Sequence, residues 1–141
     1  MSDVQVQLYL KRAKDFLEGM KLLRDDCIAY GYSSALLAVH GAVSYCDALR
    51  TGLGDDNVSA DDHREAVSRL EQLLRDKRYP KLDGLKRLSD LIGDKNAIAY
   101  GSKRVAQEKF KALTDRAERF AAWAEITGAD LKIEGWRDGA D

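Results

Sequence analysis

The chain of 141 residues has one proline, two cysteines and no long hydrophobic run. A single proline excludes collagen-like and proline-rich architectures. Cys27 and Cys46 form no Cys-x-x-Cys motif, so neither a disulfide framework nor a cysteine zinc site is expected. No apolar run exceeds that of residues 35–39, whereas a membrane helix needs roughly 20 residues, and the N-terminus has no signal sequence. We therefore expect a cytoplasmic protein with reduced thiols.

The residues that are present fit one compact domain. Hydrophobic residues make up 45% and charged residues 33%, which is enough to close one core and too apolar for a disordered chain. We expect a single helical bundle domain over residues 1–127 and a C-terminal tail over residues 128–141. The tail is rich in glycine and acidic residues, and we expect it to fold back on the bundle through Trp136.

Apolar residues recur at steps of three and four along most of the chain, which predicts helices. Amphipathic helices are predicted over residues 3–26, 60–75, 80–100 and 102–127. A fifth helix, from Ser33 or Ser34 to residue 49, is apolar almost all round and should be central. The expected boundary signals are a connection over residues 27–32, a Ser59–Asp62 capping box, Pro80 at a helix start, and Gly101 and Gly128 at helix ends. The fold class is all-α, an antiparallel up-and-down bundle of four to five helices.

The two histidines fall on the apolar stripes of their predicted helices. His40 and Asp47 point the same way, because seven residues bring a helix back to within about 20 degrees. They lie two turns apart, roughly 10 Å, which is too far for a direct hydrogen bond. His63, from a helix expected to run antiparallel, is the candidate for the place between them. Each histidine is either a core residue bonded to a carbonyl or carboxylate, or part of a functional polar pocket.

Other catalytic and cofactor motifs are incomplete. No metal site is expected, because no two of the suitable side chains are four residues apart on one helix and HExxH is missing; these side chains are His40, Asp47, Asp61, Asp62 and His63. Gly52-Leu-Gly54 completes no phosphate-binding loop, and Cys46 is expected to pack in the core and not to act as a nucleophile. We expect no cofactor.

Basic residues gather between residues 76 and 111, with ten Lys and Arg against five Asp and Glu, a local charge of +5. The rest of the chain then carries −6, because the net charge is −1. Such a flank can meet the phosphates of RNA or of a nucleotide, but solvated helix faces also have this pattern. Only Tyr79, Tyr100 and Phe110 interleave the basic residues, which is too few to predict a surface that stacks single strands.

Three segments resemble parts of the HEPN superfamily, the higher eukaryote and prokaryote nucleotide-binding domains. They are Ser34-Ala-Leu-Leu-Ala-Val-His-Gly-Ala-Val-Ser-Tyr-Cys-Asp-Ala-Leu49, Asp62-His63-Arg-Glu-Ala66, and Leu85-Lys-Arg-Leu88 leading into Lys95-Asn-Ala-Ile-Ala-Tyr100. The last segment resembles the superfamily's signature, an Arg followed by four to six residues, the first of them polar, and then a His. The resemblance extends from the first helix to about Thr127, and it implies an up-and-down bundle that often dimerises, with the signature facing a shared cleft.

In active relatives the signature Arg and His cleave RNA without a metal, through attack by the ribose 2'-hydroxyl that leaves a cyclic phosphate. This chain has Lys95 in place of Arg and Tyr100 in place of His. Lysine cannot offer phosphate the bidentate fork of arginine, and a phenol is a poor general base at neutral pH. Lys95 can still neutralise a phosphate, and Asn96, one turn before Tyr100 on the same side, can donate and accept hydrogen bonds.

Three functions follow from these patterns. The leading one is a homodimeric module that binds RNA or a nucleotide, or that serves a nucleotidyltransferase or an antitoxin as its protein partner. The second is a divergent metal-independent endoribonuclease of a toxin-antitoxin or defence system, and the third a protein-interaction domain without a ligand site. No membrane partner is expected. The candidate catalytic residues are His40, His63 and Tyr100, and the candidate ligand-binding residues are Lys95, Asn96 and Asp47.

Overall fold

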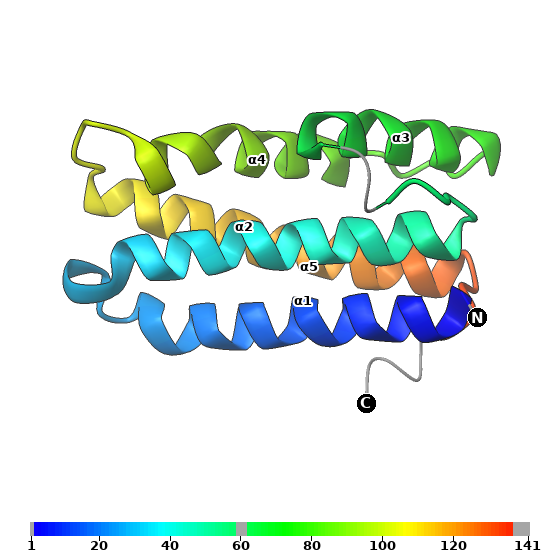
Figure 1. The fold of residues 1–141 in the computed structure, drawn as a ribbon, viewed down its shortest axis with the longest axis horizontal. Helices are drawn as coiled ribbons and strands as arrows, with labels where there is room; N and C mark the ends of the chain where they lie inside the picture. The colour runs from blue at the N-terminus through cyan, green and yellow to red at the C-terminus, as the bar shows by residue number, and fades with distance from the viewer. Residues whose placement is uncertain (1, 59–61, 137–141) are drawn as a thin grey trace.

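The computed structural model describes residues 2–58 and 62–136, and this part of the chain contains five helices and no strand. The helices lie side by side in an elongated bundle (Figure 1), which confirms the predicted all-helical class. No helix in the described residues combines the length and the apolar character that a bilayer span requires. The elements are α1 (Ser2–Arg24), α2 (Cys27–Gly52), α3 (His63–Asp76), α4 (Gly84–Tyr100) and α5 (Gln107–Asp130).

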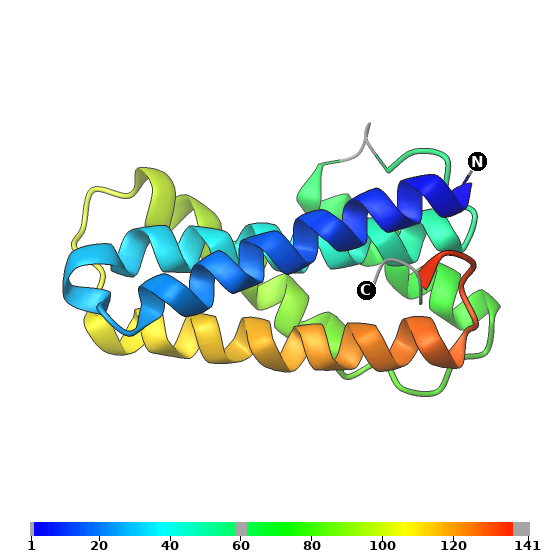
Figure 2. The same cartoon turned by 90° about the horizontal axis from the view of Figure 1, so that it is seen from below.

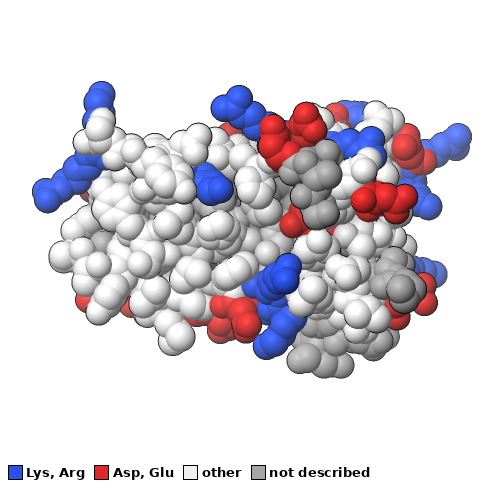
Figure 3. All heavy atoms as spheres, in the orientation of Figure 1, with Lys and Arg blue, Asp and Glu red and all other residues white. Residues whose placement is uncertain are grey.

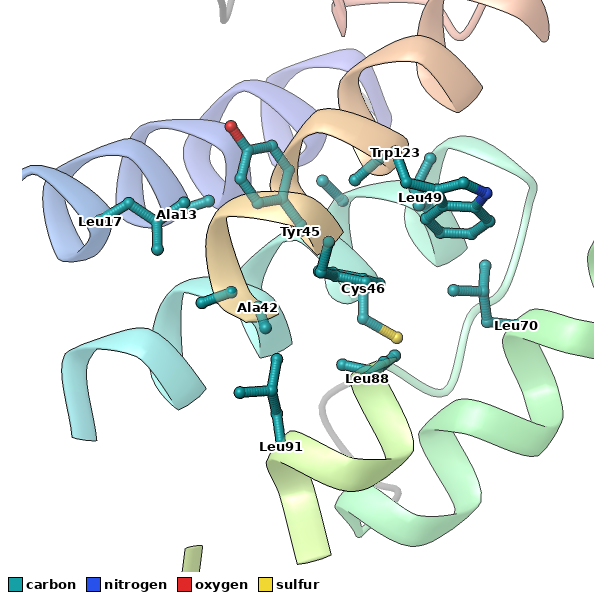
Figure 4. Packing of buried hydrophobic residues seen from close by; sticks show 14 of the residues in the cluster. Ala13, Leu17, Ala42, Tyr45, Cys46, Leu49, Leu70, Leu88, Leu91 and Trp123 are labelled. Atoms are coloured by element: carbon teal, nitrogen blue, oxygen red, sulfur yellow. The ribbon is translucent and has the colours of Figure 1, made fainter. Parts of the chain in front are cut away.

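α2 is the central helix, as its apolar sequence predicts, and it packs against all four other helices (Figures 1 and 2). Its small residues allow this close approach, since Ala42 and Cys46 are fully buried. Figure 4 shows Cys46 beside Leu88 of α4 and Ala42 beside Leu91. Both leucines are wholly removed from water, and each such burial stabilises the fold by about 1.5–3 kcal/mol.

Side-chain pairs fix the direction of α3 relative to α2. The Cys46 thiol donates to the carbonyl oxygen of Ala66 at 3.9 Å, and farther along both helices Arg69 reaches Asp55, which follows α2. Residue numbers therefore rise together along the two helices, and α3 runs parallel to α2. The antiparallel direction expected for α3 is wrong, because α3 begins beside the middle of α2 and not at its end (Figure 1). The connection from α2 to α3 is thus a departure from a strict up-and-down order.

The predicted connection over residues 27–32 is wrong, because these residues form the first turns of α2. The Asp26 carboxylate caps this helix by accepting a hydrogen bond from the Ala29 amide at 3.2 Å. The helix then kinks at Tyr30 (φ −127°, ψ 21°), next to Gly31, against which the ring of Phe110 packs. Ser34 lies inside the helix, where its hydroxyl donates to the Gly31 carbonyl, so it is not a cap.

The predicted starts of the later helices also differ from the structure. Residues 59–61, and with them Ser59 of the expected capping box, lie outside the described residues; the Asp62 side chain caps α3 by accepting from the Glu65 amide at 2.9 Å. Pro80 does not open α4, since the chain turns at Arg78 (φ 57°) and the helix begins at Gly84.

α5 begins at Gln107 and not at Ser102, because residues 101–106 cross from α4 to α5 outside any helix. The Val105 amide in this crossing donates to the Tyr32 hydroxyl at 3.1 Å. Gly101 ends α4 as predicted, whereas α5 runs through Gly128 to Asp130.

The segment after α5 folds back on the bundle, as predicted for Trp136. This side chain is only 4% exposed, and its indole packs flat against Gly128, where no side chain could fit beside it. Its ring also lies 6.4 Å from that of Tyr45 in α2. The C-terminal segment through Trp136 therefore belongs to the core.

Candidate functional site

A groove of about 510 Å³ lies between the first half of α3 and the later part of α4; we call it the α3–α4 groove. Its lining includes two cations, one carboxylate, several neutral polar groups and two apolar side chains. From the α3 side it is lined by Asp62, His63, Arg64, Val67 and Ser68. From the α4 side it is lined by Ser89, Ile92, Gly93, Lys95 and Asn96.

Local features of the sequence explain how the residues on both sides of this groove are positioned. Asp62 caps α3, so His63 and Arg64 are its first residues, where backbone amides have no acceptor within the helix. A helix N-terminus carries partial positive charge and favours anions. On α4, Ser89, Gly93 and Asn96 follow at steps of four and three, which puts them on one face. A Cβ built at Gly93 would meet no atom within 4 Å, so the groove is open there.

Three basic side chains from three helices, His40, His63 and Lys95, lie close enough to influence one another; we call them the Lys95 cluster. Burial lowers the pKa of His63 below its ordinary value, and the nearby Lys95 ammonium lowers it further, against the opposing effect of Asp62. The pKa of His40 is lowered by burial, then by Lys95, then by His63. Both imidazoles are therefore neutral at neutral pH, and Lys95 carries the cluster's charge.

The histidines are less buried than their apolar stripes predict. His40 is exposed on α2, where its ring lies 5.7 Å from that of Phe16, and His63 is half-buried. Neither histidine is a fully buried core residue. His63 lines the groove, and His40 lies beside it.

Two basic side chains that line the groove, Arg64 and Lys95, form no ion pair within the part of the chain that the structure describes. Lys86 and Arg87 earlier on α4 pair with Asp90 and Asp83, at 3.6 and 3.5 Å. In contrast, Lys95 makes no ion pair with any residue among 2–58 and 62–136. Figure 3 shows blue and red groups close together over α3, whereas isolated blue groups lie in a wide white area where α2 begins and α4 ends.

Two of the predicted site residues lie outside the groove. Tyr100 is 81% exposed at the end of α4, so its ring does not pack in the core. Asp47 lies within electrostatic reach of Arg50 and of Arg12 in α1; burial raises its pKa to about 7, against the effect of the two arginines. The structure thus brings His40, His63, Lys95 and Asn96 together and leaves Asp47 and Tyr100 apart from them.

A second charged cluster, which sequence reasoning missed, is buried where α2 ends. We call it the Arg50 cluster: Arg50, 1% exposed, donates from Nε and Nη2 to Asp55 Oδ2 at 2.8 Å, while Asp55 Oδ1 accepts from Arg69 at 3.4 Å. Burial alone would raise the pKa of Asp55, but hydrogen bonds from the Asn57 amide and both arginines outweigh it and lower the pKa. An arginine on an otherwise apolar helix, followed by Asp five residues later, was the available signal.

Nucleophilic and metal chemistry finds little support in the described residues. Cys46 is fully buried, and burial raises the pKa of its thiol far above the usual range, so it packs as predicted and is unreactive. Within residues 2–58 and 62–136, no three His, Cys, Asp or Glu side chains are arranged to hold a metal ion. Asp61, one of the side chains considered as a metal ligand, lies outside the described residues.

Comparison with protein-family models found no match, and comparison with curated proteins found none either. The class of this protein therefore follows from its structure alone. It is an all-helical bundle with a groove between α3 and α4 that Arg64 and Lys95 help to line. The relationship to the HEPN superfamily stays a prediction from the sequence.

Proposed function

We propose that the protein is a HEPN-like module that binds RNA or a nucleotide, and that the α3–α4 groove holds a phosphate of this ligand. The observation that carries the proposal is that Lys95 makes no ion pair with any residue among 2–58 and 62–136, in a groove that also offers hydrogen-bond donors. An ammonium with no carboxylate partner attracts anions and steers them toward the site. The N-terminus of α3 adds donors at the opposite wall.

Each groove residue has a distinct part in this proposal. The Lys95 ammonium neutralises the phosphate, and Arg64 supplies a second cation that has no ion-pair partner among the described residues. The imidazole of His63 donates a hydrogen bond. The amide of Asn96 can donate and accept, which suits the edge of a base or a ribose hydroxyl.

A divergent metal-independent ribonuclease is the second candidate, and the neutral state of the two imidazoles favours it. A neutral imidazole beside Lys95 can accept the proton of a ribose 2'-hydroxyl, while Lys95 stabilises the charge that develops on phosphorus. The same reaction needs an acid to protonate the leaving 5'-oxygen. Both imidazoles are neutral at pH 7 and Tyr100 lies outside the groove, so the only protonated group left for this task is the Lys95 ammonium, which the scheme already uses to stabilise the phosphate charge. Binding without cleavage is therefore our leading proposal.

Binding is tested by fluorescence anisotropy with a labelled mixed-sequence RNA and by competition with AMP and UMP. We expect Lys95→Ala to weaken RNA binding about tenfold and to reduce its salt dependence by the equivalent of one phosphate contact. The matched control is Lys86→Ala, which removes a cation of the same helix that is already paired with Asp90. Equal losses for the two variants, or no binding by the wild type, would overturn the proposal.

Cleavage is tested with mixed RNA in EDTA, scoring the cyclic phosphate end, for the wild type and for His40→Ala, His63→Ala and Tyr100→Phe. Cleavage that disappears with His63→Ala would establish the ribonuclease in place of the binding module. Intact RNA in every reaction supports the module.

The homodimer and the protein partner, a nucleotidyltransferase or an antitoxin, are also part of this proposal and rest on the family resemblance. Light scattering of the purified protein checks the first. Co-purification with proteins encoded beside it checks the second.

A further inference from the structure

We propose that the ligand of the α3–α4 groove is a single strand of at least two nucleotides, and that Tyr100 stacks on the base next to the one held at Asn96. This inference rests on the proposed function and specifies its ligand. It is carried by the geometry of α4, by the exposure of Tyr100 and by the charges around the end of this helix.

The groove wall on α4 points directly to Tyr100. Ser89, Gly93 and Asn96 line the groove, and continuing the same sequence of steps by four residues reaches Tyr100. All four residues therefore lie on one face of the helix. Asn96 and Tyr100 are about 6 Å apart along the axis. The next nucleotide can span this distance, because stacked neighbours in a strand are about 3.4 Å apart and unstacked ones farther.

Tyr100 is free to receive a base. Its side chain is 81% exposed and has no hydrogen bond or ring contact with any residue among 2–58 and 62–136. Proteins that bind single strands present aromatic rings in this way, because every base has a face that can stack on them. A tyrosine packed for stability would bury its ring.

The charges around the end of α4 fit a nucleic acid backbone. Lys103 and Arg104, just after Tyr100, are exposed and make no ion pair within the described part of the chain. The carboxylate of α4 nearest to Tyr100 in sequence, Asp94, is bound by Lys109 at 3.2 Å and by Arg116 at 3.4 Å, which offsets its charge. The path from Lys95 to Arg104 is therefore positively charged.

The crossing that follows Tyr100 is fixed by a second exposed tyrosine. Tyr32, 43% exposed, accepts the hydrogen bond from the Val105 amide, and its ring packs edge-on against Phe110 with centroids 4.9 Å apart. This contact joins parts of the chain that are 73 residues apart. The position of Tyr32 beside the basic stretch therefore could not be predicted from the sequence, which places only Tyr79 and Tyr100 within that stretch.

The experiment compares UMP, the dinucleotide UpU and the tetranucleotide U4 for binding to the full chain by calorimetry. We expect U4 to bind the wild type at least about tenfold more tightly than UMP. Tyr100→Ala should weaken U4 about tenfold and leave UMP unchanged, because stacking is lost while the phosphate site remains. Tyr100→Phe should keep the affinity for U4, since its ring can still stack.

Leu22→Ala is the matched control, because Leu22 is as exposed as Tyr100 but lies on α1, away from the groove. It should change no affinity. If UMP and U4 bind equally, both depend on Lys95, and Tyr100→Ala changes neither, the inference is wrong while the proposed function stands. If no ligand binds, the proposed function itself fails. If Tyr100→Ala spares U4 but converts a dimer to a monomer in light scattering, Tyr100 belongs to an interface between copies, which also overturns the inference.

Discussion

The Arg50 cluster and the Lys95 cluster each include one residue of α2, but they differ in whether their positive charge is paired with a carboxylate. Arg50 is buried; its Nε donates a hydrogen bond to Asp55 Oδ2 at 2.8 Å, and its Nη2 forms an ion pair with the same oxygen at 2.8 Å. Lys95 lies at a groove and has no carboxylate partner among the described residues. The first arrangement joins the end of α2 to the loop and to α3, whereas the second leaves charge available to a ligand.

Solvation explains the difference. Removing a guanidinium from water costs several kcal/mol, so Arg50 can be buried only with a carboxylate bonded to it. A partly exposed ammonium keeps its water and can remain unpaired. The neighbouring imidazoles respond by staying neutral, since burial and Lys95 both disfavour their charged forms. The paired charge of Arg50 supports the fold, whereas Lys95, which has no ion pair among the described residues, lies in the candidate site.

Removing the carboxylate of the Arg50 cluster is the strongest test of this contrast. Asp55→Ala should lower the free energy of unfolding by about 3–5 kcal/mol, because it leaves the Arg50 guanidinium buried without its partner. Arg69→Ala should cost under about 1 kcal/mol, since Arg69 is half exposed and its contact is 3.4 Å long. Urea unfolding followed by circular dichroism measures both. Similar losses for the two variants would show that burial does not distinguish the contacts.

Asp47 tests the same principle with a negative charge. Burial raises its pKa to about 7, far above that of an unfolded Asp, so the folded protein holds a proton there that the unfolded chain releases. The stability that this proton contributes is present at acidic pH and is lost as pH rises toward 7. Asp47→Asn should therefore raise the free energy of unfolding by roughly 1–2 kcal/mol at pH 8 and by little at pH 4.5. A gain that is the same at both pH values would contradict this explanation.

Much of the local structure could be predicted from the sequence. The apolar sequence of α2 predicts a central helix, and Gly101 marks the end of α4. Lys95 and Asn96 were predicted ligand-binding residues, and both line the groove. Periodicity carries this information because each residue's side of a helix follows from its number alone.

The contacts between distant segments could not be predicted in the same way. The direction of α3 depends on where its connection returns along α2, and loop composition does not encode that path. The first turns of α2 read as a connection because Gly31 is there, but the glycine serves to admit the ring of Phe110. The burial of Arg50 could not be predicted, because an arginine near a helix end is usually solvated. The sequence predicts that Tyr100 lies in one site with His63. In the structure Tyr100 is exposed at the end of α4, beyond the groove.

Acidity should tighten anion binding at the Lys95 cluster. In the free protein the pKa values of His40 and His63 are below 6.5, and a bound anion favours the imidazolium form, so binding takes up protons. Affinity for sulfate, which stays a dianion in this range, should rise by up to about tenfold per pH unit per proton as pH falls from 7 to 5.5. The His40→Gln/His63→Gln double variant should flatten the profile. Without an anion the trend in stability is opposite: the neutral imidazoles contribute fully above pH 6.5, and this contribution is lost as pH falls. If the affinity of the wild type for sulfate does not change with pH, the two histidines do not take part in anion binding.

The smallest expected effect concerns the groove wall itself, where α4 has room that the core lacks. Gly93→Ala should raise the free energy of unfolding by about 0.5–1 kcal/mol, because alanine favours a helix interior and its Cβ meets no atom within 4 Å. Gly84→Ala on the same helix is the control, and it should destabilise the protein because its Cβ would overlap the indole of Trp123. The melting temperatures of the two variants compare an open position on α4 with a packed one. A lower melting temperature for Gly93→Ala would show that other atoms pack against this position.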